Sequence, residues 1–137
     1  MDNKLLTLQN DVQQVPQLAQ FVDETCEAAG LDMATAMKLT LAVEEAVVNV
    51  MNYAYPAGTV GDVCIEVHTD NNQLVFIISD SGKPFDPTTK DEVDTTLSAE
   101  ERPIGGLGIH LVRNIMDSID YERKDGKNIL TLSKKLK

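Results

Sequence analysis

The sequence predicts an α+β fold: a two-layer sandwich of a mixed, largely antiparallel sheet and about three helices. The chain has 137 residues, enough for one compact core and too few for two, so we assign residues 1–137 to a single domain. Hydrophobic residues make up 42% and charged residues 25% of the chain, as is usual in a globular protein. Runs of strands occur beside helices that can pack together, and this order favours two layers.

The first half of the chain predicts one short strand and two long helices. Residues 5–8 form the short strand. From about 12 to 29 the hydrophobic residues recur at helical spacing, and Gly30 is placed to end that helix. Asp32 can cap the start of a second helix, which we expect to run to about Tyr53.

The second half predicts four strands, one helix and a long loop. Hydrophobic and polar residues alternate over 63–68, as in a half-buried strand, and residues 74–79 form its neighbour. Residues 86–103 contain few hydrophobic residues, and a loop this long is usually functional, often as a lid over a site. A third helix and two closing strands are predicted at 107–118, 119–123 and 128–133. The turn between the last two strands is Asp125-Gly126, a strong hairpin signal.

The formal charge is −10, from 12 basic and 22 acidic residues. Nucleic acids require clustered Lys and Arg, and an anionic membrane surface repels an acidic protein, so we expect neither as a partner. No apolar run approaches the roughly 20 residues that span a bilayer, and the N-terminus lacks a signal-peptide pattern. Cys26 and Cys64 have no metal-binding spacing. We therefore expect free thiols and a cytoplasmic protein.

The second predicted helix carries a polar ridge on an otherwise hydrophobic segment. Glu45 and Asn49 stand four residues apart and share one helix face, and Asn52 lies one turn further on. Buried carboxylates and amides are costly without partners, so this ridge indicates a cleft that holds water or an ion. An Asn carbonyl suits Mg²⁺, and a nearby carboxylate can act as a general base. The alternative is a ridge that faces solvent, which is the role we expect for Glu44.

A second cluster, Asp80-Ser81-Gly82, follows a predicted apolar strand and leads to Phe85. A carboxylate at the end of a strand could accept hydrogen bonds from an exocyclic amine such as that of adenine. The glycine would let a flat ligand approach the backbone closely. The alternative is an ordinary turn, because Asp, Ser, Gly and Pro are all common turn residues.

A third cluster, Gly105-Gly106-Leu107-Gly108, comes directly before the third predicted helix. A glycine-rich turn at a helix start exposes backbone N–H groups beside the positive end of the helix dipole. Such a site suits phosphate. The alternative is a tight turn with close helix packing.

In this order and spacing, the three clusters resemble the motifs of the GHKL ATPase superfamily. They look most like those of bacterial anti-sigma-factor serine kinases. Glu45 and Asn49 resemble the N-box of the family, Asp80-Ser81-Gly82 its first glycine box, and residues 105–108 its second. The resemblance covers nearly the whole chain. It implies the histidine-kinase-like ATPase fold, or Bergerat fold.

The resemblance also implies roles for single residues. Glu45 would be the general base and Asn49 the Mg²⁺ ligand of a site that binds ATP and ADP. Asp80 would recognise the adenine amine, and Gly82 would leave room for the base. The remaining predicted ATP-binding residues are Asn52, Phe85, Gly105, Gly106, Leu107 and Gly108. The segment before the glycine loop would be the ATP lid.

By this resemblance the chain is an ATP-dependent protein serine/threonine kinase that acts as an anti-sigma regulatory factor. Its partners would be a small antagonist protein, which it phosphorylates, and a sigma factor, and a homodimer is also compatible with the family. The alternative is a non-catalytic, nucleotide-gated protein-binding module of the same fold. Retention of Glu45 favours the enzyme.

Overall fold

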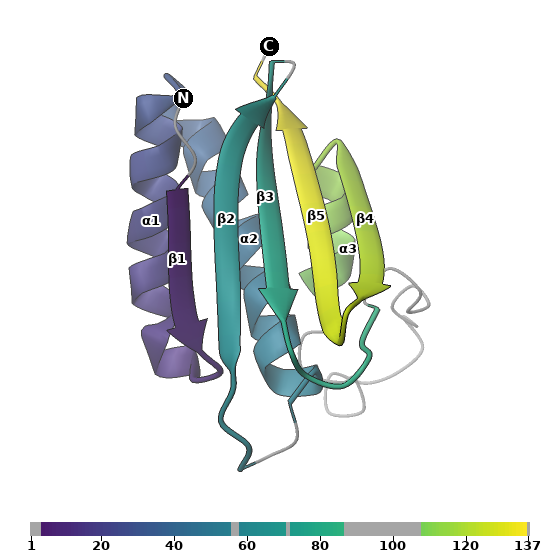
Figure 1. Cartoon of the computed structure of the whole chain (residues 1–137). Coiled ribbons are helices and arrows are strands. Elements are labelled where there is room, and N and C mark those ends of the chain that lie inside the picture. Colours follow the sequence, from purple (N-terminus) through teal and green to yellow (C-terminus); the bar gives the residue numbers. More distant parts are fainter. Residues whose placement is uncertain (1–3, 56–57, 71, 87–107, 137) are drawn as a thin grey trace, which may run out of the picture.

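A computed structural model describes residues 4–55, 58–70, 72–86 and 108–136 (Figure 1). The strands are β1 (Lys4–Gln9), β2 (Asp62–Asp70), β3 (Gln73–Asp80), β4 (Ser118–Lys124) and β5 (Lys127–Lys135). The helices are α1 (Val15–Ala28), α2 (Met33–Tyr53) and α3 (Gly108–Ile115), and a short 3₁₀ helix, η1 (Val12–Gln14), precedes α1. The elements occur in the predicted order.

The five strands form one sheet in the order β1-β2-β3-β5-β4, and every pairing among the described residues is antiparallel. The sheet was predicted to be mixed and largely antiparallel, and among the described residues it contains no parallel pair. All three helices lie on the same face of this sheet, with α2 between α1 and α3 (Figure 1). The predicted two-layer α+β fold is confirmed.

The core lies between the helix layer and the sheet. In β2 the alternation predicted from the sequence is present, because Val63, Ile65 and Val67 are fully buried while the residues between them are partly exposed. Helix α2 contributes the facing side chains, among them Leu39 and Val43. Burying each such side chain stabilises the fold by about 1.5–3 kcal/mol before entropy costs.

Local signals in the sequence set the ends of several elements. The Asp32 side chain accepts a hydrogen bond of 3.1 Å from the backbone N–H of Thr35, so it caps α2 as predicted. Gly30 has a φ of 76°, a conformation that favours glycine after a helix. At the β4–β5 turn, Asp125 and Gly126 have φ of 53° and 77°. Two positive values are typical of the hairpin turn predicted there.

Helix α3 is shorter than the predicted helix of 107–118. The backbone N–H of Asp117 donates to the carbonyl of Ser133 at 2.9 Å, and Ser118 pairs with Ser133 as the first residue of β4. The helix therefore ends at Ile115, before the predicted end at 118, because residues 117 and 118 already pair with β5. The predicted lid over 86–103 lies outside the described residues except for Asp86, and residues 105–107 of the glycine loop also lie outside them.

The two cysteines are free, as predicted, and Cys26 is buried. Burial, with a smaller contribution from the Asp23 charge, raises the pKa of the Cys26 thiol to about 11. This thiol is therefore inert at neutral pH. No helix in the described part of the chain is long and apolar enough to cross a membrane.

Candidate functional site

Asp80 is the last residue of β3 and is only 4% exposed. Its Oδ1 atom accepts two hydrogen bonds, one from the Gly82 backbone N–H at 2.8 Å and one from Asn128 Nδ2 at 2.9 Å. Its Oδ2 atom accepts none from the described residues. The carboxylate is thus held through Oδ1, and Oδ2 can accept a hydrogen bond from a ligand or from a residue outside the described part of the chain.

Burial raises the pKa of the Asp80 carboxyl. The hydrogen bonds from Asn128 and Gly82 and the positive charge of Arg123 oppose this effect without cancelling it. A buried carboxylate is costly to keep charged unless further donors reach it. A ligand that donates a hydrogen bond to Oδ2 would lower that cost.

Asn128 holds this carboxylate in place, and the sequence analysis did not identify it. It lies opposite Asp80 in the pairing of β3 with β5 and is 3% exposed. Its amide donates to Asp80 Oδ1 and to the Lys83 carbonyl, and its oxygen accepts from the Phe85 N–H and the Tyr121 hydroxyl. These four bonds use the full capacity of an Asn amide. The sequence does contain a signal for Asn128. It is a polar residue in the alternating pattern of β5 whose next inward-facing members are Leu130 and Leu132.

Gly82 allows the segment after β3 to pack on the end of α2. A Cβ atom at this position would lie 2.3 Å from the Ala54 carbonyl oxygen, so no other residue fits without a backbone shift. The neighbouring Lys83 N–H donates to the same carbonyl at 2.8 Å. The C-terminal ends of β3 and α2 therefore meet at one end of the domain (Figure 1). The predicted role of Gly82, to leave room for adenine, stays a prediction, because the close neighbour found beside Gly82 is the backbone of Ala54.

Asn49 lies within the same C-terminal part of α2, and it is 3% exposed. Its Nδ2 atom is buried and has no hydrogen-bond partner among the described residues. An unpaired buried amide costs about 1–3 kcal/mol, so a partner or ligand is expected there. Glu45, one helical turn earlier, is half-buried. The roles of Asn49 and Glu45 as an N-box stay predictions.

Two other polar residues of α2 are placed elsewhere. Asn52, predicted in the ATP site, is exposed and lines a separate hollow of about 450 Å³ together with residues that include Gln9 and Asn10. Asp80 does not line this hollow, and a role of Asn52 in ATP binding stays a prediction. Glu44 is not simply solvated as expected. It is half-buried in a groove beside α1, and burial, with a smaller contribution from Glu45, raises the pKa of its carboxyl.

Phe85 packs against the end of α2, and its role in ATP binding stays a prediction. Its ring stacks on Tyr53 at the end of α2, with centroids 5.5 Å apart and planes inclined by 27°. Its backbone N–H donates to Asn128 at 3.1 Å. The Tyr55 hydroxyl accepts from the Ser81 N–H and donates to the Asp62 carbonyl. Tyr53 and Tyr55, which were not predicted from the sequence, therefore connect the segment after β3 to the C-terminal end of α2 and the residues that follow it.

The metal prediction rests on Asn49 alone. Among the described residues, no three His, Cys, Asp or Glu side chains group as metal ligands. The donor chemistry nevertheless fits Mg²⁺, which usually takes one or two protein oxygens and completes its shell with phosphates and water. Of the glycine loop, Gly108 is described as the first residue of α3, and Gly105, Gly106 and Leu107 lie outside the described residues.

Fold and site together define a class of protein: a small α+β domain with a buried acid at a strand end and a buried amide on the facing helix. The family described as histidine kinase-like ATPase domain matches residues 8–134, and the chain belongs to this family. A serine/threonine-protein kinase, BtrW of Bordetella bronchiseptica, is 30% identical over 95 residues, covering 69% of this chain and 67% of that protein. The serine-protein kinase RsbW of Listeria innocua is 30% identical over 106 residues, covering 74% and 68%.

Solved structures share the fold at lower identity. The structure of the RsbU and RsbW domains of Rv1364c from Mycobacterium tuberculosis has a TM-score of 0.69 and 12% identity, covering 98% of this chain and 32% of that one. A histidine kinase domain from Erythrobacter litoralis has a TM-score of 0.55 and 15% identity, covering 91% and 60%. The predicted resemblance to this family is confirmed.

Proposed function

We propose that this chain is an ATP-dependent protein serine/threonine kinase that acts as an anti-sigma regulatory factor. The observation that carries the proposal is the buried Asp80 carboxylate, whose Oδ2 lacks a donor among the described residues in a fold of the histidine kinase-like ATPase family. Relatives about 30% identical are named serine kinases, which supports protein phosphorylation over other uses of a nucleotide.

Asp80 is proposed to select adenine. Its Oδ2 would accept a hydrogen bond from the exocyclic amine, while Asn128 and Gly82 hold Oδ1 and so fix the direction of the free oxygen. A guanine carbonyl at the same place would face a carboxylate oxygen, and two acceptors repel. The phosphates would lie toward the start of α3 at Gly108, because helix N-termini favour negative charge.

Asn49 and Glu45 are proposed to serve the transfer step. The buried Asn49 amide would turn its oxygen to Mg²⁺, which when bound with ATP neutralises charge on the phosphates. Glu45 shares its helix face, one turn earlier, and is half-buried, so it can take the proton from the attacking serine or threonine hydroxyl. That oxygen then bonds to the terminal phosphorus as the bond from phosphorus to the leaving ADP oxygen breaks.

The proposed substrate is a small antagonist protein, with a sigma factor as the second partner and the cytoplasm as the location. The direct test incubates the purified chain with a candidate antagonist and ATP labelled in the terminal phosphate. We expect label on one serine or threonine of the antagonist, dependent on Mg²⁺. A chain that binds ATP and antagonist but transfers no label would instead be a nucleotide-gated binding module.

A further inference from the structure

Helix α2 exposes a hydrophobic stripe on the outer surface of the helix layer. Met33, Met37 and Leu41 are 79%, 67% and 44% exposed. They are spaced four residues apart, so they lie along one face of the helix. Only two other large hydrophobic residues in the described part of the chain are exposed, Leu5 and Val60. The three are therefore a continuous feature of α2 and not scattered surface residues.

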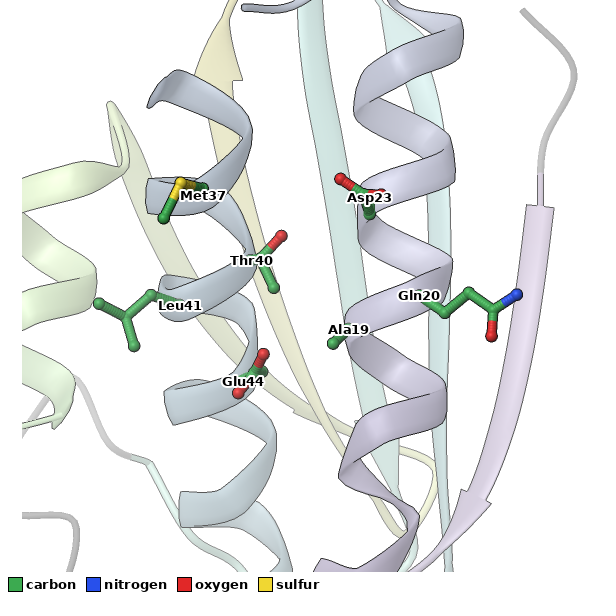
Figure 2. A pocket seen from close by; sticks show the side chains of 7 residues that line it. All are labelled: Ala19, Gln20, Asp23, Met37, Thr40, Leu41 and Glu44. Carbon is green, nitrogen blue, oxygen red and sulfur yellow. The ribbon is translucent and has the colours of Figure 1, made fainter. Parts of the chain in front are cut away.

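The stripe borders two grooves, and Leu41 lies between them. A hollow of about 610 Å³ lies between α1 and α2 and is lined by Ala19, Gln20, Asp23, Met37, Thr40, Leu41 and Glu44 (Figure 2). A second hollow, of about 360 Å³, lies between α2 and α3, and its lining includes Leu41, Leu111 and Ile115. Leu41 lines both hollows. An apolar helix face beside grooves is a surface on which another helix can pack.

Charges of opposite sign border the two sides. On the α1 side stand Asp23 and Glu44, and Glu27 joins Asp23 beside Met33. On the α3 side stand Lys38 and Lys134, of which Lys134 lies 3.9 Å from Asp117. Among the described residues, Asp23, Glu27 and Glu44 make no ion pair, so the acidic side is the less compensated one. Burial already raises the pKa of Glu44, so a cation placed beside this carboxylate would be favourable.

We propose that this surface, Met33-Met37-Leu41 with the α1–α2 groove, binds an amphipathic helix of a protein partner that carries a basic flank toward α1. The apolar side of that helix would cover the three exposed side chains, which is the common mode of helix recognition in a groove. Its Lys or Arg residues would face Asp23, Glu27 and Glu44. An anionic membrane is disfavoured by the same acidic border. The proposal does not depend on nucleotide chemistry, because none of these residues belongs to the Asp80 site.

The test uses the full chain with ¹³C-labelled methionine methyl groups and two synthetic helical peptides of about 18 residues, or five turns. Both peptides carry the same leucine stripe, but one has lysines on a flank and the other has glutamates there. We expect the lysine peptide to shift the Met33 and Met37 methyl signals. Met51 and Met116, which are buried, should stay unchanged as internal controls. Equal binding of both peptides, or shifts in neither exposed methionine, would overturn the proposal.

Variants locate the binding. Met37→Glu should lower the affinity for the lysine peptide by about tenfold or more, as expected for a central apolar contact. Val60→Glu, which changes an equally exposed residue outside the stripe, should not. Replacing Asp23 and Glu44 by Lys should lower the affinity for the lysine peptide about two- to fivefold for each charge. The same replacements should raise the affinity for the glutamate peptide. Sedimentation showing a dimer that Met37→Glu abolishes would assign the surface to self-association instead.

Discussion

The two halves of α2 depart from an ordinary amphipathic helix in opposite ways. In its C-terminal half a polar residue, Asn49, is buried without a described partner. In its N-terminal half hydrophobic residues, Met33 and Met37, face outward. A helix that only packed on a sheet would place polar groups outside and apolar groups inside throughout.

Each half of α2 therefore lacks a different kind of partner. The buried amide lacks a hydrogen-bonding ligand, and the exposed stripe lacks an apolar cover. Both conditions cost free energy in the isolated chain and would be relieved by binding. The first condition fits a polar ligand at Asn49, and the second fits a protein surface at the stripe. We therefore expect substitutions in the two halves to affect different measurements.

The largest effect is expected at Glu45. Glu45→Ala should slow phosphorylation of the antagonist protein about 10²–10⁴-fold, because general-base catalysis contributes on that scale. Nucleotide affinity, measured by calorimetry, should be retained. Glu44→Ala is the matched control, since this residue lies about 100° around the helix and lines the α1–α2 groove. At saturating partner it should leave the rate nearly unchanged, and equal slowing by both variants would contradict the assignment of the base.

Asp80→Asn should weaken ATP binding about 5- to 150-fold, the range for losing one buried hydrogen-bonded partner. Asn retains an oxygen that can accept from Gly82 and Asn128, so the fold should be maintained while the free acceptor becomes a donor. Calorimetry with ATP and GTP measures the effect. Equal affinity of the unmodified chain for the two nucleotides would remove Asp80 from base recognition.

The fold and its polar clusters were accessible from sequence because they depend on local patterns. Strand alternation, the Asp32 cap and the Asp125-Gly126 turn each act within a few residues, and all three are present. The end of α3 was misplaced because it depends on the pairing of Ser118 with Ser133, which is distant in sequence.

The site was only partly predictable for the same reason. Asn128 stands opposite Asp80 through strand pairing, and no spacing in the sequence connects residues 48 positions apart. Asn52 was included because it lies one turn beyond Asn49, but a shift of three residues also rotates a side chain around the helix. Asn52 is exposed and Asn49 is buried, so the spacing alone does not place both side chains in one site. Glu44 was misjudged because the packing of α1 on α2 determines its burial.

A smaller effect, on stability, is expected at Asn49. Asn49→Leu removes a buried amide that lacks a described partner and fills similar volume, so the free energy of unfolding should rise by about 1 kcal/mol. Urea unfolding without nucleotide measures it. The same variant should lose the Mg²⁺ dependence of ATP affinity. A loss of stability would mean that the amide is paired in the free protein.

The smallest effect is expected at Met37, in the exposed stripe of the N-terminal half of α2. Met37 is 67% exposed and Leu39, two residues along the same helix, is fully buried. Met37→Gln should therefore change the free energy of unfolding by no more than about 0.5 kcal/mol, as surface substitutions usually do. Leu39→Ala should lower it by about 2–5 kcal/mol through the cavity it leaves. Both are read from urea unfolding of the chain without partner. If Met37→Gln destabilised the chain as much as Leu39→Ala, the Met37 side chain would already be covered in the free protein. The stripe would then be part of the core, and the contrast between the two halves of α2 would reduce to the buried Asn49 alone.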